Sequence, residues 1–368
     1  MESIHPTSNE TNPPTPPTAS PIFSGIVNFS GRGGEFFGIW IVNILLSVLT
    51  LGIYSAWAKV RTYRYFYGNT QIDGHSFDYL ATPIQILKGR ILAVVVFVIY
   101  SLVVQLLPLI GLLFALGFLL AMPWIINQGL RFNMRMTRHR NVRFAFSGNY
   151  GDAFVNFVLL PIASVFTLYL LLPYALKRMD QYLHENISYG NKAINVNLKG
   201  ETYYMAALIT IGVAIAGLVI FSIFVDISGV AMSVGNVDPG NLNVSTILFP
   251  VLIMALYIAF LTLLSAVYQS IIRNHIFNSS EFDDVASFKS DLKAADYAIL
   301  LFTNALAIIF SLGMAYPWAK IRRARLLAKA TEVTIYSGAL AIIDTAQQEQ
   351  SSFAEEAANV FDIDISLT

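Results

Sequence analysis

The chain has 368 residues, of which 55% are hydrophobic and 12% charged, and its mean hydropathy is +0.60. A soluble domain carries about 25% charged residues, so we expect lipid, not water, to surround much of this chain. Its 23 basic and 23 acidic residues cancel, which argues against nucleic acid as a partner. The absence of cysteine excludes disulfides, thiolate catalysis and cysteine-ligated metals.

The two ends of the chain differ in composition from the middle. Residues 1–21 are rich in Pro, Thr, Ser and Asn and lack the apolar core of a signal peptide. Residues 345–368 carry acidic side chains and no Lys or Arg. We expect two disordered tails at 1–21 and 345–368, flanking a membrane domain at 22–344.

Uncharged apolar runs mark the expected membrane segments. They cover Phe36–Ala58, Ile91–Leu130, Ala153–Leu176, Thr202–Val225, Asn241–Ile272 and Tyr297–Ala319. The run Ile91–Leu130 is long enough for two helices, and Pro108 near its middle favours a tight turn between them. Hydropathy therefore predicts seven apolar segments.

An internal repeat is the next feature of the chain. Trp57-Ala-Lys-Val-Arg61 resembles Trp318-Ala-Lys-Ile-Arg322, and a weaker copy ends at Arg178. When Arg61, Arg178 and Arg322 are aligned, an acidic residue falls at one shared position upstream, and Asn43 aligns with Asn304. The three acids are Glu35, Asp152 and Asp296. The pattern predicts repeats over about 22–130, 131–272 and 273–344, of which the third is partial.

Each predicted repeat has the same order of elements. A short extended segment leads to an apolar helix whose first turn carries the acid, where negative charge suits the helix dipole. An amphipathic helix follows, which in the first copy carries Trp on one side and Lys and Arg on the other, typical of a membrane interface. Turn pairs then predict hairpins at Asp73-Gly74, Gly190-Asn191 and Ser337-Gly338.

Three stretches of the first repeat carry a family resemblance. The segments 31–40 (GRGGEFFGIW), 51–61 (LGIYSAWAKVR) and 64–79 (RYFYGNTQIDGHSFDY) resemble the YjgN-like family of bacterial inner-membrane proteins. The resemblance spans roughly residues 22–343. It implies a multi-pass inner-membrane location. Because the family's shared domain is one of unknown function, it implies no activity, cofactor or catalytic residue.

The placement of Lys and Arg allows two topologies, since basic loops stay in the cytoplasm. In one, all seven segments cross as spanning helices. In the other, Phe36–Ala58, Ala153–Leu176 and Tyr297–Ala319 are re-entrant, four helices cross, and all 23 basic residues and both termini are cytoplasmic. We favour the second. The predicted architecture is an α-helical membrane bundle with a small strand-containing cytoplasmic cap.

The candidate functional residues each have a structural and a functional interpretation. The repeated acids and arginines could relay protons, or could fix the orientation of helices at the interface. Four amide side chains in or near apolar segments could line a solute path, or could hold helices together by hydrogen bonds. They are Asn43, Asn127, Gln269 and Asn304.

The sequence leaves the molecular function open between two classes. Repeats, broken helices and intramembrane amides favour a transporter or channel for a small solute or ion. The amphipathic helices favour a scaffold or lipid-interacting factor, with the bilayer and anionic lipid headgroups as partners. We find no catalytic motif, no His pattern for a metal and no cofactor motif, so an enzyme is not expected. Substrate and oligomeric state are not predicted.

Overall fold

The computed structural model describes residues 20–227 and 244–345 of the chain. Four of its helices are long and apolar enough to cross a membrane. They are α3 (Pro83–Leu106), α4 (Pro108–Arg135), α8 (Gly200–Ile227) and α10 (Val244–Asn278). Helices α3 and α4 meet at Leu107 with Pro108 at the first turn of α4, where proline is tolerated. The predicted turn at Pro108 is confirmed.

Three helical hairpins accompany these long helices, one before α3, one between α4 and α8, and one after α10. In each, a shorter apolar helical segment reaches a tip, and a second helix packs back along it. The first hairpin is α1 (Gly33–Leu49) and α2 (Ser55–Gly68). The second is α5 (Tyr150–Phe154), the π-helix η1 (Val155–Leu159), α6 (Leu160–Phe166) and α7 (Leu172–Glu185). The third is α11 (Ala294–Phe310) and α12 (Tyr316–Lys329).

All strands in the described part of the chain join one antiparallel sheet of eleven strands. They are β1 (Pro21–Ile26), β2 (Asn28–Phe29), β3 (Thr70–Ile72), β4 (His75–Tyr79), β5 (Thr137–His139), β6 (Val142–Phe146), β7 (Ile187–Tyr189), β8 (Lys192–Val196), β9 (Ser280–Phe282), β10 (Ala286–Ser290) and β11 (Thr331–Tyr336). Their order is β1-β11-β10-β9-β8-β7-β6-β5-β4-β3-β2.

The sheet curls into a nearly closed barrel because its two edge strands are neighbours in the chain. Strand β1 pairs with β11 and β2 pairs with β3. Only Val27 separates β1 from β2, and its N–H donates to the Thr331 carbonyl at 2.9 Å. The first strand segment therefore joins the last strand to the first hairpin, and few strand edges are left unpaired.

The barrel has an apolar interior. Buried side chains from the strands meet a short helix over residues 338–345. This helix contributes Ala339, Ile342 and Ile343 to the same core. The barrel is thus filled as the core of a soluble domain is filled, with apolar groups removed from water.

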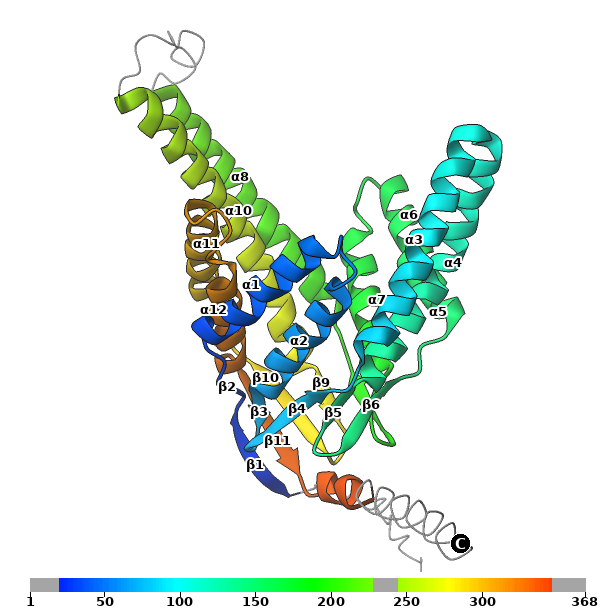
Figure 1. Cartoon of the computed structure of the whole chain (residues 1–368). Coiled ribbons are helices and arrows are strands. Elements are labelled where there is room, and N and C mark those ends of the chain that lie inside the picture. Colours follow the sequence, from blue (N-terminus) through cyan, green and yellow to red (C-terminus); the bar gives the residue numbers. More distant parts are fainter. Residues whose placement is uncertain (1–19, 228–243, 346–368) are drawn as a thin grey trace, which may run out of the picture.

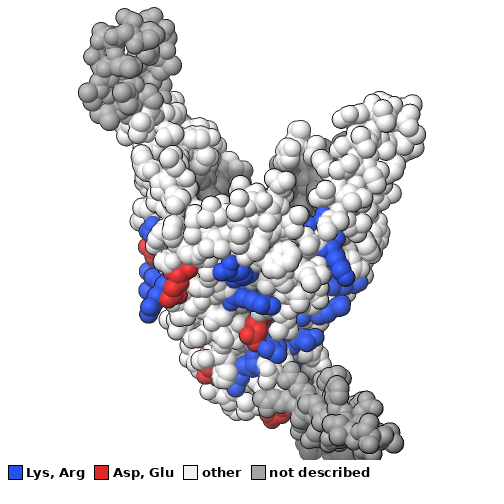
Figure 2. Space-filling model, in the orientation of Figure 1, with Lys and Arg blue, Asp and Glu red and all other residues white. Residues whose placement is uncertain are grey.

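The helices and the barrel occupy opposite ends of the molecule. In Figure 1 the pairs α3–α4 and α8–α10 project as two arms that splay apart above the sheet, and α1 runs obliquely between them. Helix α12 also packs against α1, so the third hairpin contacts the first. Figure 2 shows Lys and Arg side chains across the lower half of this face, while the upper parts of the arms that are drawn in white show none.

The predicted bundle with a small cap is wrong for the strand-bearing part. An eleven-stranded, nearly closed barrel replaces the cap. The strands have only two to six residues each, too short for a clear alternating pattern. The hairpins β5–β6 and β9–β10 lie in stretches for which no hairpin was predicted.

Two smaller predictions have different outcomes. The hairpins at Asp73-Gly74 and Gly190-Asn191 are confirmed. The one at Ser337-Gly338 is wrong, because β11 is followed by the helix over 338–345 instead of a returning strand. Residues 1–19 and 346–368, which hold nearly all of both predicted tails, lie outside the described residues, and the division into a membrane domain and tails stays a prediction.

Candidate functional site: the hairpins and the groove beside the first one

The tips of the three hairpins share one backbone geometry. Each has two consecutive residues with positive φ, namely Leu51-Gly52, Leu168-Tyr169 and Leu312-Gly313. A hydroxyl just before the pair accepts the N–H of the residue four positions later. These contacts are Tyr54 to Thr50 at 2.9 Å, Leu171 to Thr167 at 3.2 Å and Ala315 to Ser311 at 2.8 Å. The aligned positions therefore form the same turn in all three hairpins.

The same tips are apolar and bare. The side chains of Leu51, Leu168 and Leu312 are 95%, 84% and 94% exposed. A leucine this exposed in three equivalent places is unfavourable in water and favourable in lipid. The tips are therefore the parts of the hairpins best suited to contact acyl chains.

A buried asparagine joins the two helices of the first and third hairpins. The Asn304 amide donates to the Ala319 carbonyl at 3.2 Å, and its oxygen accepts from Arg322 at 2.8 Å. Asn43 repeats this arrangement with the Ala58 carbonyl at 3.4 Å and Arg61 at 3.5 Å. Each asparagine thus pairs the apolar helix with the returning one, as expected of an interhelical contact.

The second hairpin lacks this contact. Leu160 occupies the aligned position, and the π-helix η1 lies just before it. Buried Asn156 within η1 has an Oδ1 atom with no hydrogen-bond partner in the described part of the chain. Arg178, which aligns with Arg61 and Arg322, lies half-buried on α7.

The repeated acids lie at the starts of their apolar helices and are exposed. Glu35 accepts from the Tyr65 hydroxyl at 3.2 Å and lies 3.8 Å from Arg32. Asp152 lies in the first turn of α5, which Asn149 caps by accepting the Asp152 N–H. Asp296 lies in the first turn of α11. Since Arg61 and Arg322 contact asparagines, the structure does not bring Glu35 to Arg61 or Asp296 to Arg322 as ion pairs among the described residues.

The other two amide candidates also make helix–helix contacts. Asn127 on α4 donates to the Asn149 carbonyl at 2.8 Å and accepts from the Tyr182 hydroxyl at 2.6 Å. Gln269 on α10 accepts from the Tyr297 hydroxyl at 2.9 Å. Both side chains therefore link a long helix to a neighbouring hairpin.

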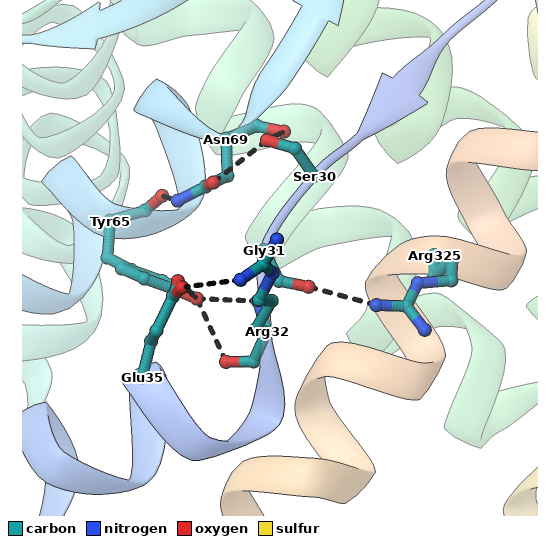
Figure 3. A network of polar contacts seen from close by, with 7 residues as sticks. All are labelled: Ser30, Gly31, Arg32, Glu35, Tyr65, Asn69 and Arg325. Carbon is teal, nitrogen blue, oxygen red and sulfur yellow. Dashed lines mark hydrogen bonds and ion pairs between the residues drawn. The ribbon is translucent and has the colours of Figure 1, made fainter.

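A polar network fixes the start of α1 at the seam between the first and third hairpins (Figure 3). The Tyr65 hydroxyl accepts the Arg32 N–H at 2.7 Å and lies 2.9 Å from the Arg32 carbonyl, to which it can donate. Arg325 on α12 donates to the Gly31 carbonyl at 3.0 Å. A Cβ atom on Gly33 would lie 2.2 Å from the Trp318 ring, so only glycine permits this approach of α1 and α12.

Beside this seam lies a groove of about 430 Å³ between α1, α2 and the start of α12. We call it the hairpin groove. One face of α1 lines it with Trp40, Ile44 and Val48, and two lysines line it from the other helices, Lys59 on α2 and Lys320 on α12. Its lining contains no Asp or Glu. The groove therefore combines an apolar wall with two positive charges.

The two lysines lie at aligned positions of the repeats and rest on aromatic rings. The Lys59 ammonium lies 5.4 Å from the centre of the Tyr63 ring. The Lys320 ammonium lies 5.4 Å from that of Phe66 and 5.6 Å from that of Tyr316. The ion pairs among the described residues all use arginine, so neither lysine has a carboxylate partner there.

Sequence reasoning used these lysines only to align the Trp-Ala-Lys motif. It did not identify the groove, because nothing local indicates that α12 lies beside α1. No cluster of His, Asp or Glu suited to a metal occurs within residues 20–227 and 244–345, and these residues suggest no nucleophile–base pair.

Comparison with known proteins agrees with the resemblance drawn from the first repeat. Residues 25–360 match the family described as bacterial protein of unknown function, DUF898. The inner membrane protein YjgN of Salmonella typhimurium is 28% identical over 351 residues, covering 83% of this chain and 87% of that protein. YjgN of Escherichia coli K12 is 35% identical over 120 residues, covering 32% of this chain and 30% of that protein. No solved structure matches the chain.

Four long apolar helices standing on a base rich in Lys and Arg define a membrane protein. The chain belongs to the DUF898 family, and the predicted YjgN-like resemblance is confirmed.

Proposed function

We propose that this protein is a lipid-interacting component of the bacterial inner membrane that inserts three re-entrant hairpins into the cytoplasmic leaflet. The four long helices cross the bilayer, and the barrel and both termini lie in the cytoplasm. We base this orientation on the lysines and arginines, which gather near the barrel in Figure 2, and on the runs 91–130 and 202–272, which contain neither residue type. The hairpins and their strands are copies of one repeated unit.

The observation that carries this proposal is the shared, exposed apolar tip of the hairpins. Leu51, Leu168 and Leu312 end segments that turn back on themselves, and each segment begins and ends beside the barrel. A segment of this kind reaches into a leaflet and leaves it by the same side, so it perturbs or senses the lipids there.

One of the three observations that favoured a transporter supports it less than before. The four amides that could line a solute path or hold helices together are hydrogen-bonded within or between the helical elements. Amides engaged in this way stabilise helix contacts and are not free to coordinate a solute.

Depth measurements in liposomes test the proposal. Because the chain contains no cysteine, one introduced cysteine is the only thiol that the fluorophore can label. A bimane fluorophore is attached to Leu312→Cys in proteoliposomes whose lipids carry bromine at different acyl positions. We expect the strongest quenching from bromines within one leaflet, and no leak of small ions from the liposomes. Equal quenching by aqueous iodide, or protein-dependent ion flux, would overturn the proposal.

A further inference from the structure

We propose that the hairpin groove binds the headgroup phosphate of an anionic phospholipid, with Lys59 and Lys320 as its ligands. This inference rests on the proposed function and names the lipid class and the site. It starts from two observations. Two lysines line a single groove whose lining contains no carboxylate, and neither lysine forms an ion pair among the described residues.

The position of the lysines along their helices argues for an anionic partner. Both lie within the first five residues of the returning helix, nearer the apolar tip than the barrel. Positive charges close to hydrocarbon are costly unless an anion or water meets them. The aromatic rings beneath both ammonium groups offset part of the cost of placing these charges near hydrocarbon, and a phosphate would offset more of it.

The rest of the groove matches the remainder of a lipid. Ile44 and Val48 continue the α1 wall from the lysines toward the tip, and Val48 is 69% exposed. An acyl chain can follow this wall while its phosphate stays at the lysines. Trp40 and Tyr63 line the same groove, and aromatic side chains of these types are enriched at the headgroup level. A soluble phosphate compound would contact the two lysines but would leave the apolar wall of the groove uncovered.

The second hairpin provides an internal contrast. Leu176 takes the place of Lys59 and Lys320 in the alignment, so only the first and third hairpins have a lysine at this position. Since α12 packs against α1, both lysines line the one groove beside α1. We therefore expect one such lipid site for each chain.

Native mass spectrometry of the full chain tests the site. Protein in micelles is titrated with phosphatidylglycerol or phosphatidylcholine, and bound lipids are counted. We expect one phosphatidylglycerol to bind in preference to phosphatidylcholine. In K59Q/K320Q the preference should fall roughly fivefold for each lysine removed. The matched control K289Q/K293Q, which removes two exposed lysines near the barrel, should keep it.

Three results would overturn the proposal. One is an unchanged lipid preference in K59Q/K320Q. Another is equal binding of the two lipids by the wild type, which needs no variant to fold. The third is displacement of the lipid by millimolar inorganic phosphate, which would assign the groove to a soluble ligand. K59R/K320R, which keeps both charges, should retain the preference.

The site and the proposed function can fail separately. If the lipid preference is unchanged but bimane at Leu312→Cys is still quenched from within one leaflet, only the groove assignment falls. If that quenching is absent, the re-entrant arrangement itself is wrong.

Discussion

The barrel and the tips of the hairpins place their apolar side chains in opposite ways. In the barrel, apolar residues such as Phe282 and Val333 face inward and are nearly inaccessible, at 6% and 3% exposed. In the hairpins, leucines are bare at the tips and asparagines are buried between the helices. Apolar side chains are thus buried at one end of the molecule, as in a protein surrounded by water, and exposed at the hairpin tips, as in a protein surrounded by lipid.

This difference shows where each part takes its stability from. The barrel gains from removing apolar surface from water. The exposed leucines at the hairpin tips do not gain in that way, so the hairpins depend on the apolar contacts that they do bury, such as those of Phe36 and Ile321, together with buried hydrogen bonds and close helix contacts. Substitutions of one kind should therefore have very different effects in the two regions, and four comparisons test this expectation.

Truncation of a large side chain gives the largest expected difference. Phe282→Ala opens a cavity in the filled barrel and should lower the free energy of unfolding by about 3–5 kcal/mol. Leu312→Ala removes a side chain that contacts only lipid or detergent and should change it by less than about 0.5 kcal/mol. Thermal unfolding of both variants in the same detergent gives the comparison. Equal losses would mean that the tip is buried in protein.

The barrel should also carry a pH dependence, through the buried His139. Burial, with a smaller contribution from nearby Arg140, lowers the pKa of His139 to about 4, and its Nε2 atom has no partner in the described part of the chain. The unfolded chain takes up this proton near pH 6.5. The fold should therefore lose stability as the pH falls from about 6.5 toward 4, by up to about 3 kcal/mol.

His139→Phe removes this group and keeps an aromatic ring beside Phe77, whose ring centre lies 4.6 Å from that of His139. The wild type should lose more of its melting temperature between pH 8 and pH 5 than the variant does. An identical loss in both proteins would show that His139 is protonated in the fold or remains in contact with water.

Two neighbouring glycines test the close contact at the seam. Gly33→Ala places a methyl group against the Trp318 ring and should destabilise the fold by about 1–3 kcal/mol. Gly34→Ala meets no atom within 4 Å and should raise stability by up to about 1 kcal/mol, because alanine favours helix. Melting temperatures that move in the same direction would contradict the packing of α1 on α12.

The smallest expected effect concerns the hydrogen bonds inside a hairpin. Asn304→Leu copies the residue found at the aligned position of the second hairpin and should cost about 0.6–1.7 kcal/mol. A double-mutant cycle with Arg322→Leu isolates the Asn304–Arg322 contact, whose atoms lie 2.8 Å apart. Strictly additive losses would show that the two side chains do not interact.

The sequence predicts the lipid-facing part of this molecule better than the barrel. Long apolar runs and Pro108 locate the long helices because their signal is local and continuous. The strands are short, and β1 pairs with β11, more than 300 residues away in the chain (Ser24 with Thr334). Pairing over such a separation leaves no local pattern. For the same reason the hairpin groove was not foreseen, although both of its lysines are in the repeated Trp-Ala-Lys motif.

Among the candidate residues, the contacts of the amide side chains were easier to predict than those of the charged side chains. Asn43 and Asn304 align in sequence, and both contact an arginine of the returning helix. The contacts of the repeated acids were not predicted, and Glu35 contacts Tyr65. Side-chain partners depend on rotation of each helix about its axis, which the spacing of residues along one chain fixes only coarsely.

The most direct test of the account is whether the hairpin tips reach the periplasm. Single cysteines replace Leu51, Leu168 or Leu312 in the full chain, with Leu107→Cys as the control at the turn between α3 and α4. Intact cells are then treated with a membrane-impermeant maleimide. The account predicts labelling of the Leu107→Cys protein alone. Labelling of any of the three tip cysteines from outside would show that its hairpin crosses the bilayer, and would contradict the re-entrant arrangement.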